Sequence, residues 1–424
     1  MPEALLSSPA SSDSLNRGGT FELLCACSSA KPGPKEIARI AGCQFADFGW
    51  EEFLRVAEHH GVAALAARNL IEHASALPSE IRRSLESAYA ANLRRGLWFA
   101  AELMRIMQHF AQKQVRAIPY KGPVLAQSAY SDLALRSFSD LDLLISPVDF
   151  ARAREVLAEI GYQPSKQLTP AVERLWLRTG YERSFDGPGG KNVLELQWAL
   201  LPYFYAVDPE YFRFDDLWAR AGRIRLDGEE VPVQNQIAQA AAQASLGGNA
   251  DVSLPSLSPE DSLLVLCLHA AKHLWTRLIW IADISQTLRM PGIDLALVIA
   301  RARSLGIVRI LGLSVWLAHH LLGAAIPSTA QEIIDGDPQI PRLGEECAAR
   351  LARCASYGLE STEYFRQMRH LRERRSDRCR YLWRLVWTPG PGDVEAVALP
   401  EFLFRLYRGV RIGRIVQKLV RSNY

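Results

Sequence analysis

The segment RSFSDLDLLI (residues 136–145) decides the fold, because it joins a pair of carboxylates to a strongly apolar strand. Side chains two residues apart on a strand point to the same face of the sheet. We therefore expect Asp140 and Asp142 to project together, while Leu141 and Leu143 enter the core. Two neighbouring carboxylates repel each other, and a divalent cation between them, such as Mg²⁺, relieves that repulsion.

A turn upstream of this strand supplies features that suit phosphate binding. Lys121 and Gly122 lie in a Lys-Gly-Pro turn, and Gly122 precedes Asp140 by 18 residues. Glycine allows the backbone to approach a phosphate closely. The amides at the start of a helix over residues 124–130 favour anions.

A third carboxylate follows a predicted hairpin. FDGPGG (185–190) is a turn signal, and the strand NVLELQWAL (192–200) carries Glu195 among apolar residues. Three carboxylates on neighbouring strands are typical of a metal site for in-line phosphoryl displacement. Asp140, Asp142 and Glu195 are therefore the predicted metal ligands and catalytic residues.

The chain of 424 residues divides into four regions on composition and periodicity. We expect a flexible N-terminal tail over 1–34, a helical region over 35–115, an α/β core over 116–258 and a helical region over 259–424. Apolar residues at three- and four-residue spacing predict the helices. Within the last region, Pro and Gly predict a linker at 325–345.

Composition limits the class of protein. The net charge is +3, with 49 basic and 46 acidic residues, which argues against a surface devoted wholly to nucleic acid. The seven cysteines are odd in number and form no CxxC pair, which favours a reducing cytoplasm over a disulfide framework. Neither a signal peptide nor a long uncharged apolar segment is evident, so no transmembrane segment is expected.

These motifs resemble those of the polymerase-β-like nucleotidyltransferase superfamily. KGPVLAQSAYSDLALRSFSDLDLLI (121–145) also resembles the bacterial uncharacterised nucleotidyltransferase family, as do NVLELQWAL and HAAKHLWTRLIWIADISQTL (269–288). The resemblance covers roughly residues 95–290. It implies an α+β fold, in which a polymerase-β-like nucleotidyltransferase core with a small mixed sheet is flanked by largely helical regions.

The resemblance also implies an activity. A nucleoside monophosphate would pass from a nucleoside triphosphate (NTP) to an unidentified small molecule, peptide, protein or RNA, with Mg²⁺ or Mn²⁺ as cofactor and pyrophosphate as product. Lys121 and Gly122 would bind the phosphates, Asp140 and Asp142 the metals, and Glu195 would bind metal or take the acceptor's proton. Two departures, Pro123 in the turn and Gln197 where the family usually has His, keep open a catalytically weak binding or regulatory module.

Several other residues have two interpretations. Arg136 binds triphosphate or orients the aspartates, or it pairs with a nearby acid such as Asp132. Arg277 is a candidate phosphate ligand from the later helical segment. His269 and His273 share a helix face, but without an intervening Glu they favour helix packing or substrate contact over a metal.

The C-terminal segment PEFLFRLYRGVRIGRIVQKLVRSNY (400–424) is a basic amphipathic helix by its pattern. Such a helix lies on a membrane surface or an anionic partner, or it packs its apolar side inward with its arginines in solvent. We favour packing. Nucleic-acid binding would rest on this segment alone.

Overall fold

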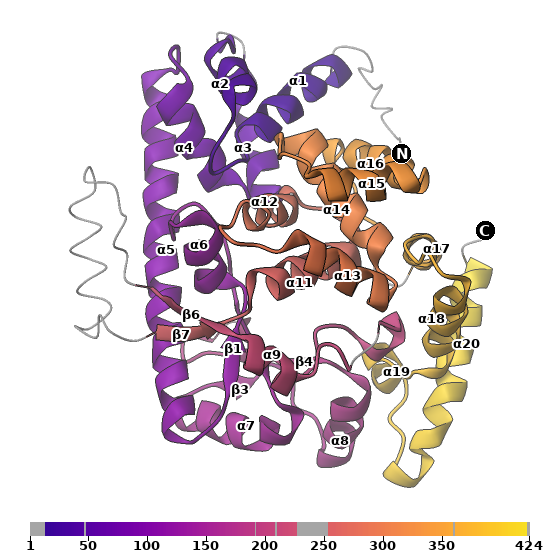
Figure 1. Ribbon diagram of the computed structural model, residues 1–424. Coiled ribbons are helices and arrows are strands. Elements are labelled where there is room, and N and C mark those ends of the chain that lie inside the picture. The colour runs from indigo at the N-terminus through magenta and orange to yellow at the C-terminus, as the bar shows by residue number, and fades with distance from the viewer. Residues whose placement is uncertain are drawn as a thin grey trace, which may run out of the picture.

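The computed structural model describes residues 13–45, 48–190, 192–207, 210–226, 253–358 and 361–421 (Figure 1). Residues 1–12 of the expected tail and residues 227–252 of the expected α/β core therefore lie outside the described residues.

A five-stranded sheet has the order β1-β2-β5-β4-β3. Its strands are β1 (Ala117–Pro119), β2 (Leu141–Ile145), β3 (Gln163–Pro164), β4 (Glu182–Asp186) and β5 (Asn192–Gln197). β2 and β5 run parallel, and every other neighbouring pair is antiparallel. The small mixed sheet expected from the sequence is confirmed, as is the α+β class.

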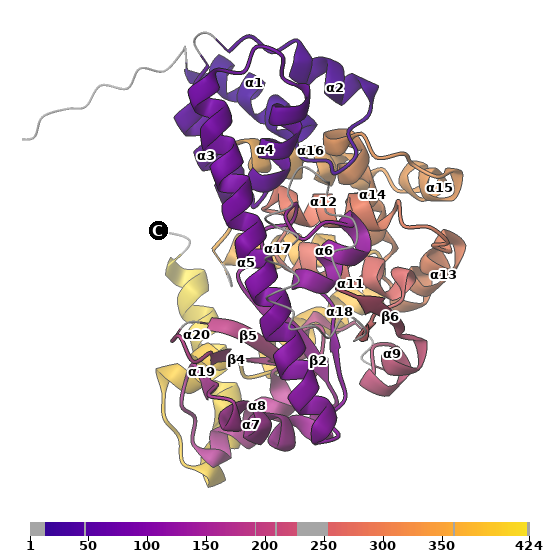
Figure 2. The ribbon, with the colours of Figure 1, turned by 90° about the vertical axis from the view of Figure 1, so that its left-hand side faces the viewer.

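A long helix supports one face of this sheet. α5 (Ser79–Gln112) runs down most of the molecule in Figure 2. Its apolar residues recur every three or four positions, and Leu103 and Phe110 share a buried cluster with Leu143 and Ile145. The connections between strands contain α6 (Gly122–Tyr130), α7 (Phe150–Glu159) with the 3₁₀ turn η1 (Pro147–Asp149), and α8 (Pro170–Thr179).

The flexible tail expected over residues 1–34 is wrong from residue 13 onward, because helices begin there. The N-terminal helices are α1 (Asp13–Ala26), α2 (Pro34–Ala41), α3 (Trp50–His59) and α4 (Ala63–His73). Phe21, Leu23 and Leu24 of α1 are buried in the larger of the two hydrophobic cores. Their apolar side chains dock the helix, and the small residues around them conceal this pattern in the sequence.

The rest of the chain after the sheet is largely helical. After η2 (Tyr203–Tyr205) come α9 (Phe214–Arg220), a two-stranded sheet of β6 (Gly222–Arg225) and β7 (Ser253–Ser256), α11 (Pro259–Lys272), α12 (Leu278–Thr287), α13 (Leu295–Leu305), α14 (Val308–Leu322), α15 (Ser328–Gly336), α16 (Gln339–Ala352), α17 (Thr362–His370), α18 (Arg375–Trp387), α19 (Pro391–Ala396), η4 (Glu401–Leu406) and α20 (Tyr407–Arg421). The expected linker at 325–345 is wrong, because Pro327 and Pro338 are the N-cap residues of α15 and α16. None of the helices in the described ranges combines the length and apolar character that a bilayer crossing needs.

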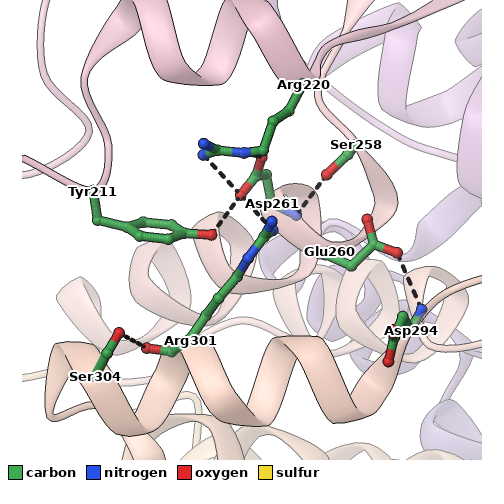
Figure 3. A network of polar contacts seen from close by, with 8 residues as sticks. All are labelled: Tyr211, Arg220, Ser258, Glu260, Asp261, Asp294, Arg301 and Ser304. Atoms are coloured by element: carbon green, nitrogen blue, oxygen red, sulfur yellow. Dashed lines mark hydrogen bonds and ion pairs between the residues drawn. The ribbon is translucent and has the colours of Figure 1, made fainter.

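A buried acid ties the sheet region to these helices (Figure 3). Asp261, fully buried near the start of α11, accepts hydrogen bonds from Arg220 Nε at 2.8 Å and Arg301 Nη1 at 3.1 Å. The hydroxyl of Tyr211 donates a third bond at 3.1 Å. Because a buried carboxylate needs compensating partners, this network fixes α9 and α13 against α11.

Candidate active site

The aspartate pair lies where the strand pattern places it. Asp142 is the second residue of β2 and is buried, while Asp140 precedes the strand and is partly exposed. Leu141 and Leu143 belong to the core that contains α5, so the two aspartates project from the opposite face.

Strand pairing brings Glu195 to the same place. β2 and β5 are parallel, and Asp142 is the register partner of Glu195. The two carboxylates therefore stand side by side on neighbouring strands of one face. This arrangement matches the expected placement of the three acids; their chemical roles are a separate question.

Gln197 connects these acids to a fourth carboxylate that the sequence did not reveal. Its amide nitrogen lies 3.1 Å from Asp142 Oδ1, 3.2 Å from Glu195 Oε2 and 3.3 Å from Glu182 Oε2. The hydroxyl of Tyr120 donates to the amide oxygen of Gln197 at 2.6 Å. Glu182 is opposite Gln197 because β4 pairs antiparallel with β5.

Two lysines supply positive charge to this cluster. Lys121 is buried, and its ammonium lies 3.0 Å from Asp142 Oδ1. Lys272, from α11, donates to the hydroxyl of Tyr181 at 3.1 Å and lies over the ring of that tyrosine. Burial lowers the pKa of Lys272, while Glu182 acts in the opposite direction.

Negative charge nevertheless dominates the face. Burial, followed by the charge of Asp142, raises the pKa of Glu195 to about 8. Burial and Asp142 also raise the pKa of Asp140, against the effect of Lys121. Desolvated like charges disfavour ionisation in this way. The cluster therefore favours an additional cation or a proton.

The Lys-Gly turn lies directly against the aspartate strand. Gly122 begins α6 with a φ of +54°, a left-handed conformation that favours glycine. A Cβ at this position would stand 3.4 Å from the backbone oxygen of Asp140. The start of α6 therefore lies against the backbone that leads into β2, so its helix-terminal amides are near the aspartate strand.

Arg136 has a different partner from the acid considered in the sequence. Its guanidinium binds Asp283 through Nε–Oδ1 at 2.8 Å and Nη2–Oδ2 at 2.9 Å, and both side chains are buried. Asp132 instead accepts from the hydroxyl of Tyr89 at 3.0 Å. Burial and Asp142 raise the pKa of Asp140, and the charge of Arg136 opposes this rise, so Arg136 still acts on the site electrostatically.

Arg277 is the N-cap residue of α12 and is exposed. Burial is the main cause of the lowered pKa of His59, His60 and His273, and the charge of Arg277 acts in the same direction. In the part of the chain that the structure describes, Arg277 forms no hydrogen bond or ion pair with the four carboxylates. A phosphate contact by Arg277 therefore stays a proposal.

The two histidines pack as ring systems. His273 stacks on Trp280 at 4.9 Å between ring centroids, and His269 meets the same ring edge-on at 5.5 Å. Burial lowers the pKa of both histidines, that of His273 to about 3. The contact of both rings with Trp280 agrees with the expected helix-packing role.

The four carboxylates of the cluster are chemically suited to bind divalent cations such as Mg²⁺. Their oxygens do not converge on a single position. Within the described ranges, no group of three or more His, Cys, Asp or Glu side chains is placed to hold a metal. Asp142 Oδ1 is engaged by Lys121 and by Gln197. Carboxylate oxygens are the ligands that Mg²⁺ and Mn²⁺ prefer. A bound cation would compete with these two nitrogens.

A cleft of about 730 Å³ opens beside the cluster. Glu182 and Ser184 line it from β4, Thr169 and Trp176 from the start and body of α8, and Lys166 from the preceding loop. The cleft is therefore large enough for a small ligand and reaches one of the four carboxylates.

Comparison with known families gives an independent finding. The model of a family described as uncharacterised nucleotidyltransferase matches residues 46–323, which is more than half of the chain. This range contains the whole five-stranded sheet and every site residue discussed above. No curated protein and no solved structure matches the chain.

Proposed function

Because the chain belongs to the uncharacterised nucleotidyltransferase family, we propose that it moves a nucleoside monophosphate from an NTP to an acceptor oxygen. The acceptor is a small molecule, peptide, protein or RNA. The observation that supports this most directly is the register of Asp142 with Glu195, beside Lys121. Free thiols at all seven cysteines fit a reducing cytoplasm, which we propose as the compartment.

In this proposal Asp140 and Asp142 would hold Mg²⁺ or Mn²⁺, and Glu195 would either complete the metal site or take the acceptor's proton. The bound cations would neutralise charge on the triphosphate and on the attacking oxygen. Lys121 and the backbone at Gly122 bind the phosphates, and the Lys121 ammonium leaves Asp142 for a phosphate oxygen. The raised pKa of Glu195 makes this carboxylate the better proton acceptor of the group.

The proposed reaction is a single displacement at the α-phosphorus. The acceptor oxygen forms a bond to the α-phosphorus, the bond from that phosphorus to the bridging oxygen breaks, and pyrophosphate leaves. The acceptor's proton passes to Glu195, or to solvent if Glu195 binds the metal. Arg136 orients the approach to β2 through Asp283 and acts on Asp140 by charge. Catalysis of this kind depends mainly on positioning and on charge neutralisation.

The test uses the full chain with Mn²⁺ or Mg²⁺ and each α-labelled NTP, offered small-molecule, peptide and RNA extracts. We expect label to move to one acceptor class and to be lost in Asp142→Asn. Asp335→Asn, an exposed acid on α15, is the matched control and should keep activity. Transfer by Asp142→Asn at the wild-type rate would overturn the assignment.

A second function has a specific observation in its favour. Gln197 and Lys121 already satisfy Asp142, so the cluster is held together without a metal. A catalytically weak module that binds nucleotide for regulation would show NTP binding without transfer to any acceptor and without dependence on a divalent cation.

A further inference from the structure

Two arginines of the C-terminal helix point inward, whereas the packing favoured from its sequence leaves the arginines in solvent. Arg411 is buried, its Nε donates to the backbone oxygen of Leu385 at 3.1 Å, and its guanidinium faces the buried carboxylate of Asp393. Arg414 also pairs with Asp393. α20 therefore turns two arginines inward, because a buried carboxylate in α19 needs them.

Six large apolar side chains of α18, η4 and α20 are exposed. We define the C-terminal patch as Trp383, Trp387, Phe402, Leu406, Ile412 and Val416. Phe402 is 82% exposed, Trp383 65%, Leu406 55% and Val416 52%. Ile412 and Val416 are one helical turn apart on α20, and Trp383 and Trp387 are one turn apart on α18. An apolar surface of this kind usually marks an interaction site.

Contacts join the two helices into one surface. The rings of Trp383 and Trp387 lie 5.2 Å apart, and the guanidinium of Arg408, from α20, lies 5.9 Å from the ring centroid of Trp387. In Figure 1, α18 and α20 form one edge of the molecule, away from α5. Arg405 and Arg408 are exposed among the apolar residues.

The charge of this region identifies the kind of partner. Residues 361–424 contain 14 Lys or Arg and 6 Asp or Glu, a net charge of +8, whereas the whole chain carries +3. At the patch itself, Arg408 lies over the ring of Trp387, and Arg405 is exposed in the same segment as Phe402 and Leu406. Helices that lie in the headgroup region of an anionic bilayer show this combination. Aliphatic side chains such as Leu406 and Val416 offer no face for stacking on nucleic-acid bases, so lipid fits better than RNA.

We infer that the C-terminal patch docks the protein on an anionic lipid surface, with its apolar side chains among the acyl chains and its arginines at the phosphates. This inference concerns a surface outside the carboxylate cluster and does not depend on the proposed reaction. It would place the nucleotidyltransferase site at a membrane, where lipid-linked or membrane-bound acceptors are within reach.

The experiment sediments the full chain with vesicles of phosphatidylglycerol or of phosphatidylcholine. We expect binding to the anionic vesicles that weakens with added salt. Phe402→Ser/Leu406→Ser and, separately, Arg405→Glu/Arg408→Glu should each lower the partition coefficient about tenfold or more. Trp98→Ser/Val148→Ser, at exposed apolar positions elsewhere, is the matched control and should bind as wild type does.

Three results would overturn the inference. The first is no binding of the wild type to phosphatidylglycerol vesicles. The second is binding to RNA that exceeds vesicle binding and is lost in the same variants. The third is a wild-type dimer that the apolar variant converts to monomer, since the patch would then be covered by a second copy.

Discussion

Arg136 and Asp283 form a two-bond ion pair across 147 residues of sequence, with Nε–Oδ1 at 2.8 Å and Nη2–Oδ2 at 2.9 Å. The hydroxyl of Tyr130 donates to the same carboxylate at 2.7 Å. The pair links the approach to the aspartate strand with α12. The shape of the candidate site therefore depends on a helix that lies outside the sheet region.

Asp283→Asn should strongly destabilise the fold. The change leaves the buried guanidinium of Arg136 without its counter-charge, and breaking a buried pair from one side costs about 3–5 kcal/mol. The free energy of unfolding in urea measures the loss. Asp335→Asn, on the exposed side of α15, is the control. Equal stability of the two variants would show that the pair contributes little.

Lys121→Met should change metal and nucleotide affinity in opposite directions. The Lys121 ammonium lies 3.0 Å from Asp142 Oδ1, where a cation would bind. Its removal should raise the affinity for Mn²⁺ alone and lower the affinity for NTP about tenfold, a change of ~1.4 kcal/mol. Titration calorimetry measures both. Lys113→Met, an exposed lysine paired with Glu159, is the control. A parallel fall in both affinities would make Lys121 a structural ion-pair partner.

Local patterns predicted much of the sheet. Side chains alternate between the two faces of the strand over residues 141–145, which determines which of them share a face. The Gly-Pro-Gly turn predicts the hairpin between β4 and β5. The common face of Asp142 and Glu195 follows from these two signals once β2 pairs with β5. Pairing between distant strands is set by tertiary packing, so the sequence could suggest this contact but not its register.

Contacts between residues that are far apart in the sequence could not be predicted from local patterns. Glu182 joins the cluster only because β4 places it opposite Gln197. Asp283 pairs with Arg136, which lies far away in the chain. The orientation of α20 depends on a buried acid, Asp393, which no periodicity reveals.

Stability should fall with acid, and His60 should account for part of the loss, alongside the buried His269 and His273. Burial lowers the pKa of His60 from 6.5 to about 4. Protons therefore bind the unfolded chain more readily, and stability present above about pH 6.5 is lost as the pH falls towards about 4. At about pH 5 the loss should be about 2 kcal/mol relative to His60→Gln.

Urea unfolding at about pH 7 and about pH 5 measures this difference. His59→Gln, at the neighbouring and partly exposed position, should flatten the pH dependence less. An identical slope in wild type and His60→Gln would show that other groups account for the acid sensitivity.

Gln197→Glu tests whether the cluster accepts a divalent cation. The amide nitrogen of Gln197 donates towards Asp142, Glu195 and Glu182. A carboxylate there removes the donor and adds a like charge, so the metal-free variant should lose at least ~2 kcal/mol of stability. Saturating Mn²⁺ should restore more stability to this variant than to wild type, because the added oxygen ligand strengthens binding.

Gln197→Met separates the two effects, since it removes the amide without adding charge. Thermal unfolding with and without Mn²⁺ compares all three proteins. We expect Gln197→Met to be destabilised and to gain no more from Mn²⁺ than wild type does. If Mn²⁺ raises the melting temperature of none of them, the four carboxylates hold no metal, and the regulatory module becomes the better account of the site.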